Sequence, residues 1–115
     1  MLISMNPTSA NADESLELIA QQFRVLGDAQ RLRILHCLQA GERTVGEIAE
    51  LTGASQSNVS KHLSLLRAAG LVGRRQAGNH AYFGITAPFI FDLCNIVCDG
   101  ARSRLAREQA LLPDY

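Results

Sequence analysis

The sequence predicts one mainly α-helical domain with a small β-hairpin, in the order helices, two-stranded hairpin, long last helix. Three observations support this fold class. Apolar residues recur at helical spacing over most of the chain, two helical segments joined by a tight turn occupy residues 44–70, and a stretch rich in β-forming residues follows at 71–85. With 115 residues, the chain can bury one core and would still gain stability by dimerising.

The beginning of the chain is rich in Ser, Thr and Asn, and we expect residues 1–12 to form a flexible arm ahead of a domain at 13–115. A helix is predicted from Asp13, because the negative charges of Asp13 and Glu14 stabilise the positive, N-terminal end of the helix dipole. Its apolar stripe, which requires a packing partner, comprises Leu16, Ile19, Ala20, Phe23 and Leu26.

A second helix is predicted between Asp28, which can cap its first turn, and Gly41, which can end it. Arg31 and Arg33 lie on this helix, and solvent exposure or pairing with Asp28 explains them at least as well as contact with phosphate. The residues expected to face the core are Leu32, Ile34, Leu35 and Leu38.

The third helix begins with a capping box, because Thr44 is followed three residues later by Glu47. Ile48 and Leu51 mark its expected buried side. Gly53 supplies the permissive backbone for the turn that ends it.

The fourth helix starts after a cap at Ser55 or Ser57, and Val59, Leu63 and Leu66 form its apolar stripe. Ser and Asn are weak helix formers, so their number on its other side requires a reason. Short hydrogen-bonding side chains of this kind suit base edges and phosphates in a major groove, although a helical hairpin with a polar face is the alternative. The polar set is Gln56, Ser57, Asn58, Ser60, Lys61 and Ser64.

The segment 71–85 is predicted to form a hairpin whose tip lies near residues 77–79. A helix-turn-helix followed by a basic hairpin is a winged helix-turn-helix, whose wing can reach the DNA backbone or minor groove. No Asp or Glu occurs from Leu51 to Phe91, so a basic face is expected although the net charge is zero. The candidate wing contacts are Arg74, Arg75, Gln76, Asn79 and His80.

Residues 23–85, FRVLGDAQRLRILHCLQAGERTVGEIAELTGASQSNVSKHLSLLRAAGLVGRRQAGNHAYFGI, resemble the arsenic-repressor (ArsR/SmtB) family of winged-helix transcription factors. The resemblance rests on GDAQRLRIL, on GE before the helix-turn-helix, on SNVSKHL and on AGLV entering the wing. It covers most of the chain. It implies a small homodimeric repressor that leaves its DNA operator on sensing an inducer.

A last helix is predicted from about residue 87 to residue 112, with Thr86 as a cap and Pro88 in its first turn. The resemblance implies that the first and last helices form the dimer interface. Arg102, Arg104 and Arg107 are interpreted as the polar face of the last helix. The predicted interface residues are Leu16, Ile19, Phe23, Ile90, Leu93, Val97, Ala101 and Leu105.

Three cysteines occur, and each can be a buried apolar residue, a ligand for a metal or metalloid, or a redox thiol. Cys37 lies between two leucines of the second helix and fits the core. Cys94 and Cys98 are one helical turn apart and can share a soft metal ion or As(III), with a third ligand from Cys37, the partner chain or solvent. Packing in the interface explains the pair about equally well.

Two metal sites implied by the family pattern are missing. Thr44 and Gly46 stand where one site has its two Cys, and the other site would fall on residues nearest to Ala87, Phe89, Gly100 and Ser103. The histidines are scattered and predict no metal site by spacing. No phosphate loop or nucleophile elbow is present, so we do not expect an enzyme.

The sequence therefore predicts a cytoplasmic homodimeric repressor on a pseudo-palindromic double-stranded operator, without a membrane span or signal peptide. Any cofactor would be As(III) or a soft metal ion at the thiols. The alternatives are a winged-helix protein-interaction module and a family member that senses neither metal nor thiol chemistry. The predicted DNA contacts are Gln56, Ser57, Asn58, Ser60, Lys61, His62, Arg74, Arg75, Asn79 and His80.

Overall fold

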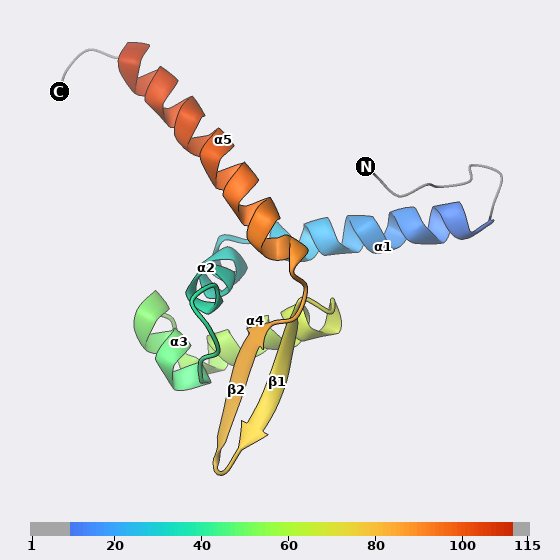
Figure 1. Ribbon diagram of the computed structural model, residues 1–115, viewed down its shortest axis with the longest axis vertical. Helices are drawn as coiled ribbons and strands as arrows, with labels where there is room; N and C mark the ends of the chain where they lie inside the picture. The colour runs from blue at the N-terminus through green and yellow to red at the C-terminus, as the bar shows by residue number, and fades with distance from the viewer. Residues whose placement is uncertain (1–9, 112–115) are drawn as a thin grey trace.

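The computed structural model describes residues 10–111 and confirms the mainly helical fold with one antiparallel hairpin (Figure 1). The first helix begins at Ala10 rather than at Asp13, and the rest of the predicted arm lies outside the described residues. The elements are α1 (Ala10–Leu26), α2 (Ala29–Leu38), α3 (Val45–Thr52), α4 (Gln56–Ala68), β1 (Val72–Ala77), β2 (His80–Ile85) and α5 (Phe89–Leu111).

The starts of α2, α3 and α4 follow the predicted local signals, whereas α5 begins at Phe89, two residues after the predicted start. The Asp28 side chain caps α2 by accepting from the amides of Gln30 and Arg31 at 2.9 and 3.1 Å. Thr44 and Glu47 form the reciprocal capping box of α3. Gly53 has a φ of 76°, the left-handed conformation that ends α3 and starts the turn into α4.

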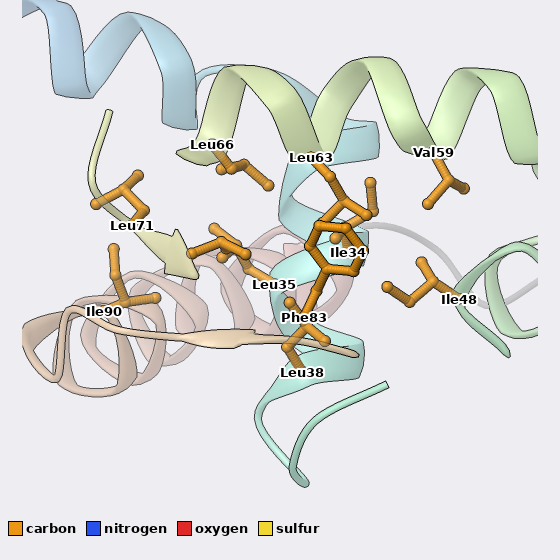
Figure 2. Close-up of a cluster of buried hydrophobic side chains, with 11 residues drawn as sticks. Ile34, Leu35, Leu38, Ile48, Val59, Leu63, Leu66, Leu71, Phe83 and Ile90 are labelled. Atoms are coloured by element: carbon orange, nitrogen blue, oxygen red, sulfur yellow. The ribbon is translucent and has the colours of Figure 1, made fainter. Parts of the chain in front are cut away.

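Side chains from α2, α3, α4, the α4–β1 connection, both strands and α5 form one core (Figure 2). The ring of Phe83 from β2 lies between Leu63 of α4 and Leu38 of α2, which joins the hairpin to the helices. The core residues are Ile34, Leu35, Leu38, Ile48, Val59, Leu63, Leu66, Leu71, Val72, Phe83 and Ile90.

Two expected core positions are wrong. Leu51 is 57% exposed, because the inward side of α3 runs through Val45, Ile48 and Ala49 and turns Leu51 to solvent. Leu32 is 43% exposed and lines a groove between α2 and α5 instead of the core.

The hairpin is fixed to the start of α3 at its base. Arg43 and Phe83 exchange two backbone hydrogen bonds, of 3.0 and 2.8 Å. Gly78, with a φ of 61°, forms the tip of the hairpin together with Asn79, within the predicted region. The wing therefore extends from a fixed base, away from α1 and α5 (Figure 1).

The helices α1 and α5 extend beyond the core in different directions, which gives the molecule its extents of 54 × 52 × 20 Å (Figure 1). Among the described residues, no helix is both long enough and apolar enough to cross a membrane. Large apolar side chains remain exposed on both helices. They are Leu16, Leu18, Phe23, Phe89, Ile96, Val97 and Leu105.

Candidate nucleic-acid interface

The first half of α4 presents polar side chains to solvent. Ser55 caps the helix by accepting from the amide of Asn58 at 3.2 Å, and Val59, Leu63 and Leu66 hold the opposite side in the core. This anchoring fixes the orientation of the helix without using its polar side. The exposed residues are Gln56, Ser57, Asn58, Ser60 and Lys61.

Most of these side chains have no strong intramolecular partner. The Ser57 hydroxyl lies 3.3 Å from that of Ser55. Within the described part of the chain, no side-chain hydrogen bond or ion pair of Gln56, Asn58 or Lys61 is found. Their donors and acceptors are therefore available to a molecule outside the protomer.

His62 differs from these residues because it is half-buried and already has a contact. Its Nδ1 lies 3.2 Å from Nη1 of Arg31 on α2. The histidine thus belongs partly to the packing between α2 and α4.

Arg75 of the wing is engaged within the protomer. Its Nη2 donates to Oε1 of Glu42 at 2.8 Å and its Nε donates to the same oxygen at 3.0 Å, while its guanidinium lies 5.0 Å from the ring centre of Tyr82. This bidentate bond lowers the pKa of Glu42 and raises that of Arg75. Glu42 reaches across β2 where Gly84 leaves room, since a Cβ there would lie 3.0 Å from its Cγ.

This contact corrects the expected charge pattern. The acid-free window in the sequence is not acid-free in space, because Glu42 from the α2–α3 connection lies against the wing. Sequence spacing gave no signal for the pair, since 33 positions separate the two residues. Arg75 is therefore not a free cation in the unbound protein.

The other predicted wing residues stay exposed. Arg74 donates to Gln76 at 2.8 Å, and Gln76 donates to the Gly78 carbonyl at 3.0 Å. His80 and Asn79 are exposed at the tip, where the His80 ring lies edge-on to Tyr82 at 6.4 Å. The wing thus offers Arg74, Asn79 and His80 beside the polar half of α4.

An apolar groove of about 310 Å³ lies between the end of α1, α2 and α5. Cys94 and Cys98 both line it, together with Phe23 and Val97. Cys94 is half-buried, and burial together with the neighbouring Cys98 raises its pKa, whereas Cys98 is exposed.

Cys37 is not part of this groove lining; its backbone carbonyl accepts from Nε of Arg43 at 3.0 Å. The structure thus brings Cys94 and Cys98 together without Cys37. Among residues 10–111, no three His, Cys, Asp or Glu side chains are grouped so that they could hold a metal ion.

The predicted interface residues differ in exposure; Ala101 is exposed, and Ile19 and Leu93 are half-buried. Leu16, Phe23, Val97 and Leu105 are exposed and available to a partner. Ile90 is fully buried among core residues of its own protomer, which leaves it no surface for a dimer contact.

The sequence of this domain matches that of known bacterial regulators. Residues 28–73 match the family described as bacterial regulatory protein, arsR family. An HTH-type transcriptional regulator of Mycobacterium tuberculosis, Rv0081, is 39% identical over 79% of this chain and 77% of its own length. The chain belongs to the arsR family. This membership confirms the resemblance and places the protein among transcriptional regulators rather than enzymes.

Solved structures of arsR-family proteins share the fold. The homodimeric winged helix-turn-helix domain of a possible ArsR-family regulator from Mycobacterium bovis superimposes with a TM-score of 0.80, at 31% identity over 90% of this chain and 95% of that one. Among the relatives compared by sequence, a probable mercury resistance operon repressor of Streptomyces lividans is 40% identical over 64% of this chain and 59% of its own length. The winged-helix architecture is thereby confirmed.

Proposed function

We propose that this protein is a homodimeric transcriptional repressor that inserts α4 into the major groove of a pseudo-palindromic operator in the bacterial cytoplasm. The observation that carries the proposal is the exposed polar half of α4, anchored from behind by Val59, Leu63 and Leu66. Side chains on the first turns of a second helix are those that read base edges in helix-turn-helix proteins. The wing beside it supplies Arg74 and the tip residues for the DNA backbone.

Dimerisation follows from the exposed apolar surface of α1 and α5. Leu16, Phe23, Val97 and Leu105 are each more than half exposed in the single chain, an unfavourable state for large apolar side chains on neighbouring elements. The homodimeric Mycobacterium bovis domain supports the same assembly. Two copies related by a two-fold axis would place two α4 helices against two half-sites.

Fluorescence anisotropy with the protein's own upstream DNA tests the proposal. We expect an affinity that falls steeply with salt and exceeds that for scrambled duplex. Absence of salt-dependent DNA binding would contradict it and favour a protein-interaction module instead.

Lys61 provides a test of the phosphate contacts. We expect Lys61→Ala to weaken binding to all duplexes alike and to reduce the salt slope by about one per protomer, because one released counterion is lost. Arg107→Ala is the matched control, since it removes the same charge from the exposed far part of α5. An unchanged salt slope in the Lys61 variant would exclude this contact.

Glu42 provides a test of the wing. We expect Glu42→Gln to release Arg75 toward phosphate, so that affinity for scrambled duplex rises about threefold and the salt slope steepens by about one per protomer. Glu50→Gln is the control, because Glu50 is exposed and does not bond Arg75. Equal affinities for the two variants would show that the Glu42 contact does not restrain Arg75.

The ion pair between Glu42 and Arg75 also predicts how DNA affinity depends on pH. The pKa of Glu42 is lowered in the folded protein, so the pair is intact at neutral pH and is lost only as the pH falls through that lowered value. Wild type and Glu42→Gln should therefore converge in DNA affinity toward acidic pH.

We further propose that Cys94 and Cys98 form the inducer site. Two thiols in one groove suit a trivalent arsenical, a soft metal ion, an oxidant or a reactive sulfur species. The mercury resistance repressor of Streptomyces lividans supports a soft ion. Packing of the thiols in the dimer interface is the alternative.

A further inference from the structure

The side chain of Arg31 joins the end of α1 to α4. Its Nε donates to the Val25 carbonyl, its Nη2 donates to the Arg24 carbonyl at 3.4 Å, and its Nη1 lies 3.2 Å from Nδ1 of His62. Only 15% of the side chain is exposed. Arg31 is therefore held in one orientation by two helices, and solvent exposure does not explain it.

The contact with His62 determines where the neutral imidazole carries its proton. A guanidinium has donors and no acceptor, so Nδ1 of His62 must accept. The ring proton then resides on Nε2, on the side of the ring away from Arg31. Within the described residues no acceptor for that N–H is found.

Among the described residues, the only carboxylate found near Arg31 and His62 is that of Asp28. Its Oδ2 lies 4.0 Å from Nη1 of Arg31, and its Oδ1 caps α2. The backbone amide of Arg31, followed by the charge of its guanidinium, lowers the pKa of Asp28. Asp28 thus remains charged at neutral pH and orients the guanidinium toward His62.

We propose that Arg31 is a positioning residue for DNA binding, which holds His62 as the Nε2–H tautomer so that this N–H donates to an acceptor atom of duplex DNA. The inference rests on the proposed function, because His62 follows Lys61 on the same helix. Arg31 acts through His62 and does not itself contact the DNA.

The tautomer can be observed in the free protein by ¹H–¹⁵N NMR of the ring nitrogens at about pH 8.5, where an ordinary imidazole is neutral. His62 is assigned by loss of its signals in His62→Ala, and His36 and His80 serve as internal references. We expect Nδ1 of His62 to show the downfield shift of an unprotonated nitrogen, and Arg31→Met to abolish this single-tautomer signature. A protonated Nδ1 in the wild type would overturn the proposal.

A double-mutant cycle on DNA affinity tests whether Arg31 acts through His62. We expect Arg31→Met to weaken operator binding about tenfold in the wild type and less than about twofold in the His62→Ala background. An equal loss in both backgrounds would overturn the proposal, because Arg31 would then act only through α1. Arg33→Met is the matched control, since Arg33 is exposed and, among the described residues, its side chain bonds only Gln30.

Two comparisons complete the experiment. If Arg31→Met weakens binding to the operator and to scrambled duplex equally, the acceptor for the His62 N–H is a phosphate oxygen. If it weakens binding to the operator more, the acceptor is a base edge. If the wild type binds no duplex DNA, the proposed function and the role in DNA binding both fail, while the NMR spectrum still decides whether Arg31 sets the tautomer.

Discussion

A Val97→Asp variant is expected to be monomeric and to bind the operator about 100-fold more weakly than the wild type. Val97 is 59% exposed on α5 and lines the apolar groove together with Phe23. A carboxylate there would have to be desolvated in a dimer interface without a partner charge. Loss of the second α4 removes the gain in affinity from binding two half-sites at once.

Analytical ultracentrifugation and anisotropy on the same samples measure both effects. Ser103→Asp is the control, because it adds the same charge to an exposed position of α5 opposite the apolar stripe. The control should remain dimeric and bind as the wild type does. A dimeric Val97→Asp protein with unchanged affinity would contradict the proposed interface.

The Cys94→Ser/Cys98→Ser variant is expected to bind the operator normally and to lose all release by thiol-reactive inducers. Both thiols line one groove next to the proposed interface, so an ion held between them can shift α5 against the partner. Anisotropy of the preformed complex, titrated with arsenite, cadmium or a mild oxidant, measures the release.

The groove also predicts how this release depends on pH. The pKa of Cys94 is raised by burial, so its thiol is protonated at neutral pH and must lose a proton to bind a soft ion. Release by cadmium should therefore require less inducer as the pH rises, because each thiol that binds Cd²⁺ gives up a proton to the solvent. Cys37→Ser is the control and should respond like the wild type, because Cys37 is not among the groove-lining residues. If the Cys94→Ser/Cys98→Ser variant is still released from the operator by these inducers, Cys94 and Cys98 are packing residues and not the inducer site.

The sequence alone was sufficient for most features that depend on neighbouring residues, although α1 and α5 begin at Ala10 and Phe89 rather than at the predicted residues. The caps at Asp28, Thr44 and Ser55, the left-handed Gly53 and the hairpin tip at Gly78 all lie where local signals indicated. Helical periodicity also identified Val59, Leu63 and Leu66 as the buried side of α4. These features are predictable because each is decided by backbone chemistry within about one helical turn.

Contacts between distant segments were decided only by the tertiary structure. Glu42 reaches Arg75 and Arg31 reaches His62 across separations of 33 and 31 residues, which no spacing rule connects. The periodicity of α3 placed Leu51 inside, but the packing of the helix against its neighbours turned Leu51 outward. The sequence by itself therefore determined the elements and most of their polar and apolar sides, whereas the packing of these elements decided where Leu51 lies, which charges are paired and which thiols meet. The physical reason is that hydrogen bonds and ion pairs act over a few ångströms in space, and only folding brings such residues that close.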